Sequence, residues 1–274
     1  MKQKGHVRSR LVLCALAAML LLGCSSVVTS EESLSVSVPP SQRFSAMQIT
    51  EAEDFSVNGK PFVLQQCDDD DMCRIVLQYG GEELEVFPFC SGFSDAWLIE
   101  GTVLAAPMLL VCADEMSDDY ITAVCMLMAE TAVVSERYAG RTVSVDTADR
   151  RLILEEQITV LGSQIAQRTY DILPDGTLQP AELGLYRIMN AEEQCVTLTT
   201  DLAAEIFRNG TWEATTLLAG TQMFPTETDG VSVVYVTLPA SGALGRLRFA
   251  LEDGTVFFDD LAEDEAFADL MYAG

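Results

Sequence analysis

The chain has 274 residues and carries 42 acidic against 16 basic side chains, which gives a formal net charge of −26 at pH 7. A charge of this sign and size excludes nucleic acid as a partner, and it excludes direct binding to an anionic lipid surface. The single histidine is His6, and Lys60 is the one lysine beyond residue 4. Ser-His-Asp and Cys-His catalysis and His-ligated metal sites are therefore excluded for the rest of the chain.

Residues 1–23 have the pattern of an export signal. Basic residues precede an apolar run over residues 11–22, which is too short to span a bilayer. The run ends at Leu21-Leu22-Gly23-Cys24, which resembles the lipobox of bacterial lipoproteins. The resemblance implies that residues 1–23 are removed, that Cys24 is lipidated, and that the lipid holds the protein at the outer face of the bacterial cell membrane. An ordinary cleaved signal or a buried apolar segment is the alternative.

Residues 24–46 are expected to form a flexible tether. They are rich in serine, contain the pair Pro39-Pro40 and show no sustained hydrophobic period. Such a segment is flexible, and stiffer at its prolines, so its expected function is spacing.

Residues 47–200 are expected to form a β-rich domain of short antiparallel strands, either propeller-like or a sandwich. Short apolar runs alternate with dipeptides that accept positive φ, as tight hairpin turns require. These dipeptides, here and beyond residue 200, are Asn58-Gly59, Gly80-Gly81, Asp175-Gly176, Asn209-Gly210, Asp229-Gly230 and Asp253-Gly254. Residues 120–136 are apolar enough for a buried helix, but their β-branched residues favour two strands with a turn at Glu130-Thr131.

An acidic stretch from Asp68 to Asp71 lies between Cys67 and Cys73. It resembles the acidic loops of exported proteins with FG-GAP or VCBS-like β-propeller repeats, in which such a loop binds calcium between strands. The resemblance implies calcium ligands at Asp68, Asp70 and Asp71. Arg74 occupies the place of the final acid, and a cation there weakens the field that calcium needs. A solvated hairpin loop without metal is the favoured interpretation, so no cofactor is expected, and bound calcium is the alternative.

The cysteines suggest disulfide bonds without fixing their pairing. Six lie beyond Cys24, and an exported chain with an even number of thiols permits several connectivities. Cys67 and Cys73 flank the acidic loop and are the candidate pair. Cys112 and Cys125 lie in apolar strand-like runs and are also explained as small buried hydrophobes.

Residues 201–274 are expected to form a small barrel that ends in a short helix over 264–272, after a link or helical turn at 201–208. The segment Leu217-Leu218-Ala219-Gly220-Thr221 and the two hairpins that follow resemble a bacterial SH3-like domain. Such domains bind peptides of the cell wall or other proteins through an aromatic groove, which implies a groove at Trp212, Tyr235 and Phe257. Burial in the core is the alternative role of these rings.

These features predict a non-enzymatic, lipid-anchored surface protein that binds a peptide, a wall polymer or a partner protein. A calcium-binding surface protein is the first alternative. A glycoside hydrolase with paired carboxylates is the second, but the many acidic residues do not single out a pair. A transporter-associated solute receptor is disfavoured because the chain lacks alternating strands and helices.

Overall fold

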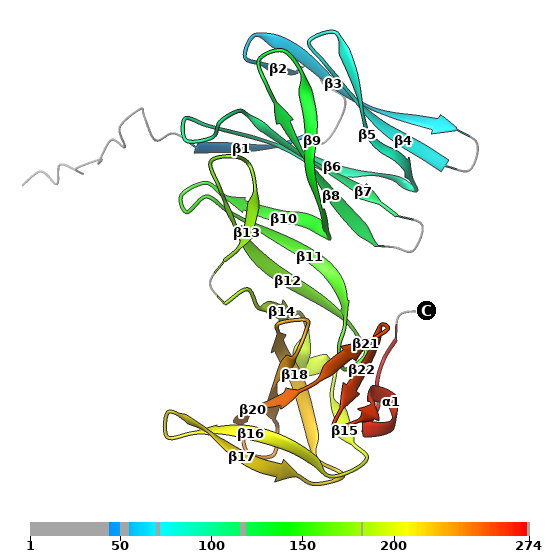
Figure 1. Ribbon diagram of the computed structural model, residues 1–274, viewed down its shortest axis with the longest axis vertical. Coiled ribbons are helices and arrows are strands. Elements are labelled where there is room, and N and C mark those ends of the chain that lie inside the picture. Colours follow the sequence, from blue (N-terminus) through cyan, green and yellow to red (C-terminus); the bar gives the residue numbers. More distant parts are fainter. Residues whose placement is uncertain (1–43, 50–54, 70–71, 116–118, 182, 273–274) are drawn as a thin grey trace, which may run out of the picture. The chain divides into compact units, whose positions relative to one another are not determined.

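The computed structural model describes residues 44–49, 55–69, 72–115, 119–181 and 183–272. The expected export signal, Cys24 and most of the expected tether lie outside these ranges. Within them the chain is mainly β and is built of antiparallel sheets, which confirms the expected fold class (Figure 1). Helical turns in the described residues are limited to η2 (Ala191–Glu193) and α1 (Glu263–Ala266). Neither is long and apolar enough to cross a membrane.

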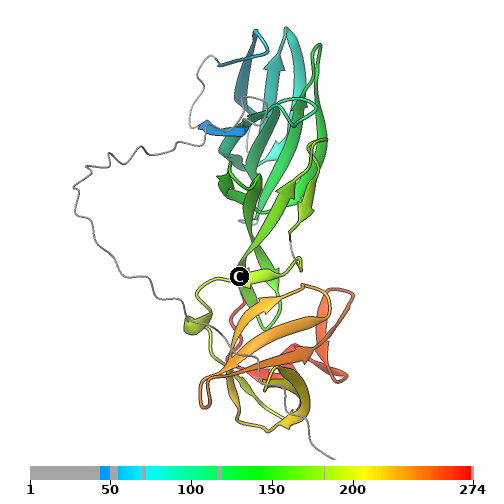
Figure 2. The ribbon, with the colours of Figure 1, turned by 90° about the vertical axis from the view of Figure 1, so that its left-hand side faces the viewer.

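Two antiparallel sheets form the first part of the described chain. The four-stranded sheet has the order β2-β3-β4-β5 and comprises β2 (Phe55–Val57), β3 (Lys60–Asp69), β4 (Met72–Tyr79) and β5 (Glu82–Cys90). The five-stranded sheet has the order β1-β6-β7-β8-β9 and comprises β1 (Phe44–Ile49), β6 (Gly92–Gly101), β7 (Met108–Asp114), β8 (Tyr120–Leu127) and β9 (Ala132–Ala139). One core joins Phe62 and Leu77 of the first sheet to Leu109 of the second. The two sheets therefore pack as a sandwich (Figure 2).

The middle strands of the five-stranded sheet are buried on both faces. In β7, Leu109 belongs to the core shared with the four-stranded sheet, whereas Met108 and Leu110 belong to a second core with Leu152 of β11 (Arg151–Thr159). Since successive side chains point to opposite faces, this sheet is the middle layer between two others. A strand in such a layer has a continuous apolar sequence instead of an alternating one.

Burial in this middle layer explains why the first part of residues 120–136, which forms β8, is apolar enough to suggest a buried helix. Residues 120–136 form β8 and β9, so the interpretation as two strands is confirmed. The amide N of Met128 donates to the carbonyl O of Thr131 at 2.9 Å, which closes the turn at the expected place.

A third, twelve-stranded sheet contains most of the remaining strands. Its main order is β10-β11-β12-β14-β18-β19-β20-β16-β17, and β13, β15 and β24 pair off this path. Its members besides β11 are β10 (Arg141–Asp146), β12 (Ser163–Ile172), β13 (Leu178–Pro180), β14 (Tyr186–Ile188), β15 (Val196–Leu198), β16 (Leu202–Arg208), β17 (Thr211–Leu217), β18 (Gln222–Thr228), β19 (Val233–Leu238), β20 (Ala243–Arg248) and β24 (Phe267–Ala268). A small sheet of β21 (Ala250–Glu252), β22 (Thr255–Phe258) and β23 (Leu261–Ala262) follows β20.

The region after residue 200 differs from the expected barrel. Hydrogen bonds from β14 and β15 to β18 carry the sheet across residue 201, where a domain boundary was expected. No sheet of the described ranges closes into a barrel, and β10 and β17 lie at the two ends of the main strand order. A link or helical turn was expected at residues 201–208, but residues 202–208 form β16 because Leu202, Ala204 and Ile206 alternate into the core.

The described residues after α1 contain no helix. The expected helix over 264–272 is reduced to α1, because Phe267 of β24 pairs with Leu198 of β15. The carboxylate of the buried Glu263 accepts hydrogen bonds from the backbone N–H groups of Leu161 and Gly162 at 2.9 and 2.8 Å. The hydroxyl of Tyr272 donates to the same carboxylate at 3.0 Å. The final segment is thereby tied to the turn between β11 and β12.

Four of the six expected turn dipeptides have positive φ at both residues, whereas Asp175-Gly176 and Asp229-Gly230 have it only at the glycine. Asn209 and Gly210, between β16 and β17, have φ of 51° and 84°, and Asp253 and Gly254 have φ of 47° and 81°. Positive φ at both central residues is the signature of a two-residue type I′ hairpin. Each of these turns fixes the register of the two strands that it joins.

Candidate functional site

Three aromatic rings and one guanidinium gather on the outer face of the twelve-stranded sheet. The ring centroids of Phe207 and Trp212 are 5.2 Å apart, and those of Trp212 and Tyr235 are 5.8 Å apart. The guanidinium carbon of Arg246 lies 4.5 Å from the Trp212 ring centroid. We call Phe207, Trp212, Tyr235 and Arg246 the aromatic cluster. Phe207 is 43 % exposed, so the cluster is open to solvent at this end.

Strand register brings these side chains together. Phe207 is opposite Trp212 across the β16–β17 hairpin, and Tyr235 is opposite Arg246 between β19 and β20. Arg246 is also opposite Glu205 of β16. Directly opposite residues share a face of the sheet, so all five side chains lie on one face. The buried Ile206 and Leu247, one position away, point to the core.

An ion pair fixes the guanidinium beside the rings. Arg246 donates from Nε and Nη2 to the two carboxylate oxygens of Glu205 at 2.7 and 2.9 Å. These hydrogen bonds lower the pKa of Glu205, so the carboxylate is charged at neutral pH. A bidentate pair holds the planar guanidinium in one orientation, and a cation over an indole face is attracted by the ring.

The cluster adjoins an open sheet edge. β17 is the last strand of its sheet, and most of its residues are exposed. In a two-residue hairpin the two residues that flank the turn, here Arg208 and Thr211, donate to and accept from each other. Further along the two strands, pairs without such hydrogen bonds alternate with pairs that have them. The N–H and C=O groups of Trp212, Ala214 and Thr216 therefore point away from β16, towards the open edge. No strand of the described ranges pairs with them, so they can pair with another extended chain.

The structure brings together two of the three aromatic residues that were expected to line a groove. Trp212 and Tyr235 lie together in the aromatic cluster, whereas Phe257 of β22 lines a different cleft of about 350 Å³ with Arg248 and Asp259. The sequence reasoning missed Phe207 and Arg246. The alternation of residues 202–208 could have revealed Phe207, had that segment been interpreted as a strand.

The acidic loop is described in part. Asp68 is exposed near the end of β3, opposite Cys73, and accepts a hydrogen bond from Gln66 Nε2 at 2.8 Å. Asp70 and Asp71 lie outside the described residues. Within the described ranges no group of three or more acidic, cysteine or histidine side chains is placed to hold a metal ion. Calcium at Asp68, Asp70 and Asp71 stays a prediction.

The structure separates the two cysteines expected as a pair. Cys67 is opposite Arg74 and Cys73 is opposite Asp68, so the two cysteine side chains lie on opposite faces of the β3–β4 ladder. The sulfur of Cys73 lies instead 3.0 Å from that of Cys90. Both of these cysteines are buried.

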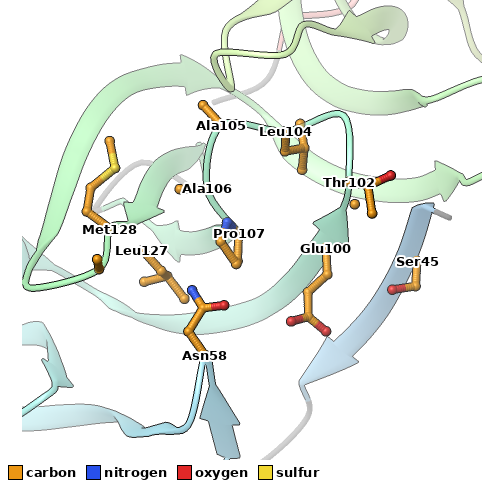
Figure 3. A pocket seen from close by; sticks show the side chains of 12 residues that line it. Ser45, Asn58, Glu100, Thr102, Leu104, Ala105, Ala106, Pro107, Leu127 and Met128 are labelled. Atoms are coloured by element: carbon orange, nitrogen blue, oxygen red, sulfur yellow. The ribbon is translucent and has the colours of Figure 1, made fainter. Parts of the chain in front are cut away.

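A cleft of about 630 Å³ opens beside the loop between β6 and β7 (Figure 3). Its wall is formed by small apolar residues of that loop, by Leu127 and Met128, and by the side chains of Asn58 and Glu100. Glu100 is the one charged side chain of the lining, which also holds the hydroxyls of Ser45 and Thr102 but no histidine, lysine or second acid that could activate them. The residues of the lining therefore do not indicate a reaction or a ligand for this cleft.

A smaller cleft of about 460 Å³ contains two glutamates with different environments. Burial acts against ionisation of Glu155, but hydrogen bonds from Gln167 and Arg141 bring its pKa below the usual value. Burial raises the pKa of Glu156. Carboxylates with diverging pKa values are typical of acid–base pairs. These two are neighbours in β11 and leave the strand on opposite faces, so they do not converge on one substrate.

No protein-family model, curated protein or solved structure matches the chain. The resemblances to propeller repeats and to an SH3-like domain therefore stay predictions.

Proposed function

We propose that the protein is a non-enzymatic, lipid-anchored surface protein that binds an extended polypeptide segment along the open edge of β17. The lipid anchor is inferred from Leu21-Leu22-Gly23-Cys24. The binding role is carried by one observation, the exposed edge strand that runs beside the aromatic cluster.

An added strand fits this edge for two reasons. The backbone groups of Trp212, Ala214 and Thr216 have no partner among the described strands, and they recur at every second residue, which is the spacing that an extended peptide pairs with. Alternate side chains of that peptide then project over the face that bears Trp212 and Phe207, where aromatic contact adds affinity and selects sequence. Glu213 is the only charged residue of β17, so this edge has few of the charges that usually keep an exposed edge strand from aggregating. A bound segment would cover the edge.

Charge narrows the class of partner. The formal net charge of −26 attracts a positively charged segment and speeds its association. The expected partner is thus an extended, basic polypeptide segment with an apolar residue that packs on Trp212.

The test uses a displayed library of random peptides, selected against the full chain, and synthetic copies of the enriched peptides. Ala214→Pro removes one outward N–H without touching the bonds to β16, and Trp212→Ala removes the central ring. Each variant is expected to weaken binding at least about tenfold, which corresponds to about 1.4 kcal/mol. Leu251→Pro is the matched control, because it changes the same kind of outward position on the edge strand β21 and is expected to leave binding unchanged.

Two results would overturn the proposal. One is the absence of enriched peptides, or peptides that bind the Ala214→Pro and Trp212→Ala variants as tightly as the unchanged protein. The other is a dimer in light scattering that Ala214→Pro converts to a monomer, because the edge would then belong to a second copy of the chain.

A further inference from the structure

β4 and β5 are neighbouring strands (Figure 1). Two buried cysteines face each other across them. Cys73 is opposite Cys90 in the register, and the two Sγ atoms are 3.0 Å apart. The Sγ of Cys90 also lies 3.5 Å from the carbonyl O of Cys73. Directly opposite residues of antiparallel strands have Cα atoms about 4.5–5.5 Å apart, within the range that a disulfide bond spans. The strand register therefore places the two cysteines within reach of a disulfide bond.

The other cysteines in described strands lack such a neighbour in the register. Cys112 is opposite Thr122, Cys125 is opposite Leu109, and Cys67 is opposite Arg74. Cys112 and Cys125 are fully buried in the middle sheet and are explained by packing. The register thus singles out one pair from the connectivities that the sequence leaves open.

We propose that Cys73 and Cys90 form a disulfide bond that joins β4 to β5 when the chain folds in the presence of a disulfide oxidant such as oxidised glutathione. One cysteine thiolate attacks a glutathione sulfur, forming a mixed disulfide and releasing one glutathione. The second thiolate then attacks the protein sulfur of the mixed disulfide and releases the second glutathione. The two protein thiols are oxidised, and one glutathione disulfide is reduced to two thiols. This bond does not depend on the role proposed for β17.

Because both cysteines are buried in the folded protein, the bond is expected to form before the sheets pack. Cys73 and Cys90 are 4 % and 2 % exposed, so an oxidant does not reach them once the sheets have packed. Burial, together with the neighbouring Cys73, raises the pKa of Cys90 to about 12, and the reactive thiolate is therefore scarce in the folded state. The bond is expected to form during folding and, once formed, to be protected from exchange.

The test is a disulfide map of the full chain, refolded with oxidised glutathione and then alkylated without reduction. Cyanogen bromide cleaves after methionine, and Met72 and Met108 enclose a fragment 73–108 that holds both cysteines. Cys67, Cys112 and Cys125 fall in other fragments. Trypsin then cuts within the fragment after Arg74. The proposal predicts a fragment without alkyl groups, lighter by two hydrogens than its thiol form, whose two tryptic pieces stay joined until reduction.

Three outcomes would contradict the proposal. Fragment 73–108 carrying two alkyl groups would show two free thiols. Linkage of this fragment to residues 48–72 would give Cys67 as the partner. Linkage to a fragment that holds Cys112 or Cys125 would give a pairing that the register does not allow. A Cys90→Ser chain, refolded in the same way, serves as the control and is expected to leave Cys73 alkylated.

Discussion

β7 and β17 are antiparallel strands of equal length, seven residues each, with opposite surroundings. β7 lies inside the middle sheet, and six of its residues are buried because both faces pack against other sheets. β17 lies at a sheet edge, and all but two of its residues are exposed. The sequence of β7 is thus accounted for by packing. The half-buried Trp212 of β17, which packs against Phe207 and Tyr235 outside the core, is not. We therefore look for the function at the strand whose side chains do not form the core.

The largest effect is expected in β7. Leu109→Ala leaves a cavity at a fully buried position and should lower the free energy of unfolding by about 3 kcal/mol. Thr216→Ala is the control in β17, where the side chain is exposed, and should change it by less than about 0.5 kcal/mol. Denaturant unfolding checks both values. Equal losses would remove the distinction between the two strands.

The bond proposed between Cys73 and Cys90 should contribute on a similar scale. The two cysteines are 17 positions apart, and closing a loop of that size stabilises a fold by about 3 kcal/mol in the chain-entropy model. The unfolding midpoint of the oxidised chain should therefore fall on addition of a reductant. A Cys90→Ser chain should show no dependence on the reductant. A midpoint that is equal with and without reductant in the unchanged protein would argue against the bond.

Glu263 is expected to contribute clearly to the free energy of unfolding, although it lies near the end of the chain. Glu263→Ala leaves the N–H groups of Leu161 and Gly162 without their acceptor in a buried place, at an expected loss of about 2 kcal/mol. Glu263→Gln keeps one oxygen acceptor and should lose less. Thermal unfolding compares the two variants. The account is wrong on this point if alanine and glutamine are tolerated equally.

Replacing Asp229 is expected to lower the free energy of unfolding by a smaller amount, and this loss should depend on pH. Burial acts against its ionisation, but hydrogen bonds from Ser232 and from the backbone N–H groups of Val231 and Val233 bring its pKa below the usual value. A lowered folded-state pKa stabilises the fold above the unfolded-state pKa of about 3.9, and the stabilisation is lost as the pH falls through the folded-state pKa. Asp229→Asn should therefore lose about 1 kcal/mol at pH 7, and the difference should shrink towards pH 2. A constant difference across this range would exclude the charge as its source.

The smallest effect is expected for proline at the open edge. Ala214→Pro removes an N–H that faces away from β16 and should change the free energy of unfolding by about 0.5 kcal/mol or less. Thr215→Pro removes an N–H that bonds to Ala204 and should cost at least about 1 kcal/mol. The comparison is made by denaturant unfolding. The reverse order would mean that the outward and inward positions of β17 are assigned to the wrong residues.

Local signals in the sequence predict local structure well in this protein. The turn at Asn209-Gly210 and the strands over residues 120–136 follow from positive-φ dipeptides and β-branched residues. The three-layer packing does not follow, because a continuous apolar run such as 108–113 is the same for a strand buried on both faces and for a buried helix. The third layer becomes visible only in the structure, where residues 108 and 110 pack against Leu152 and Tyr170, which lie far along the chain.

The candidate site was predictable only in part for the same reason. Trp212 and Tyr235 stand out as aromatic residues, but their contact depends on the register of two separate hairpins. Arg246 and Glu205 form their ion pair because β20 lies next to β16, which a sequence period does not reveal. The edge position of β17 is likewise a property of the strand order and not of its residues.

Backbone amide exchange, measured residue by residue with and without a selected peptide, tests the central claim most directly. In the free protein the amides of Glu213 and Thr215 should exchange slowly, because they bond to β16, and those of Trp212, Ala214 and Thr216 should exchange fast. Peptide binding should slow exchange at Trp212, Ala214 and Thr216 and leave Glu213 and Thr215 unchanged. A bound peptide that leaves the outward amides fast would contradict strand addition at β17.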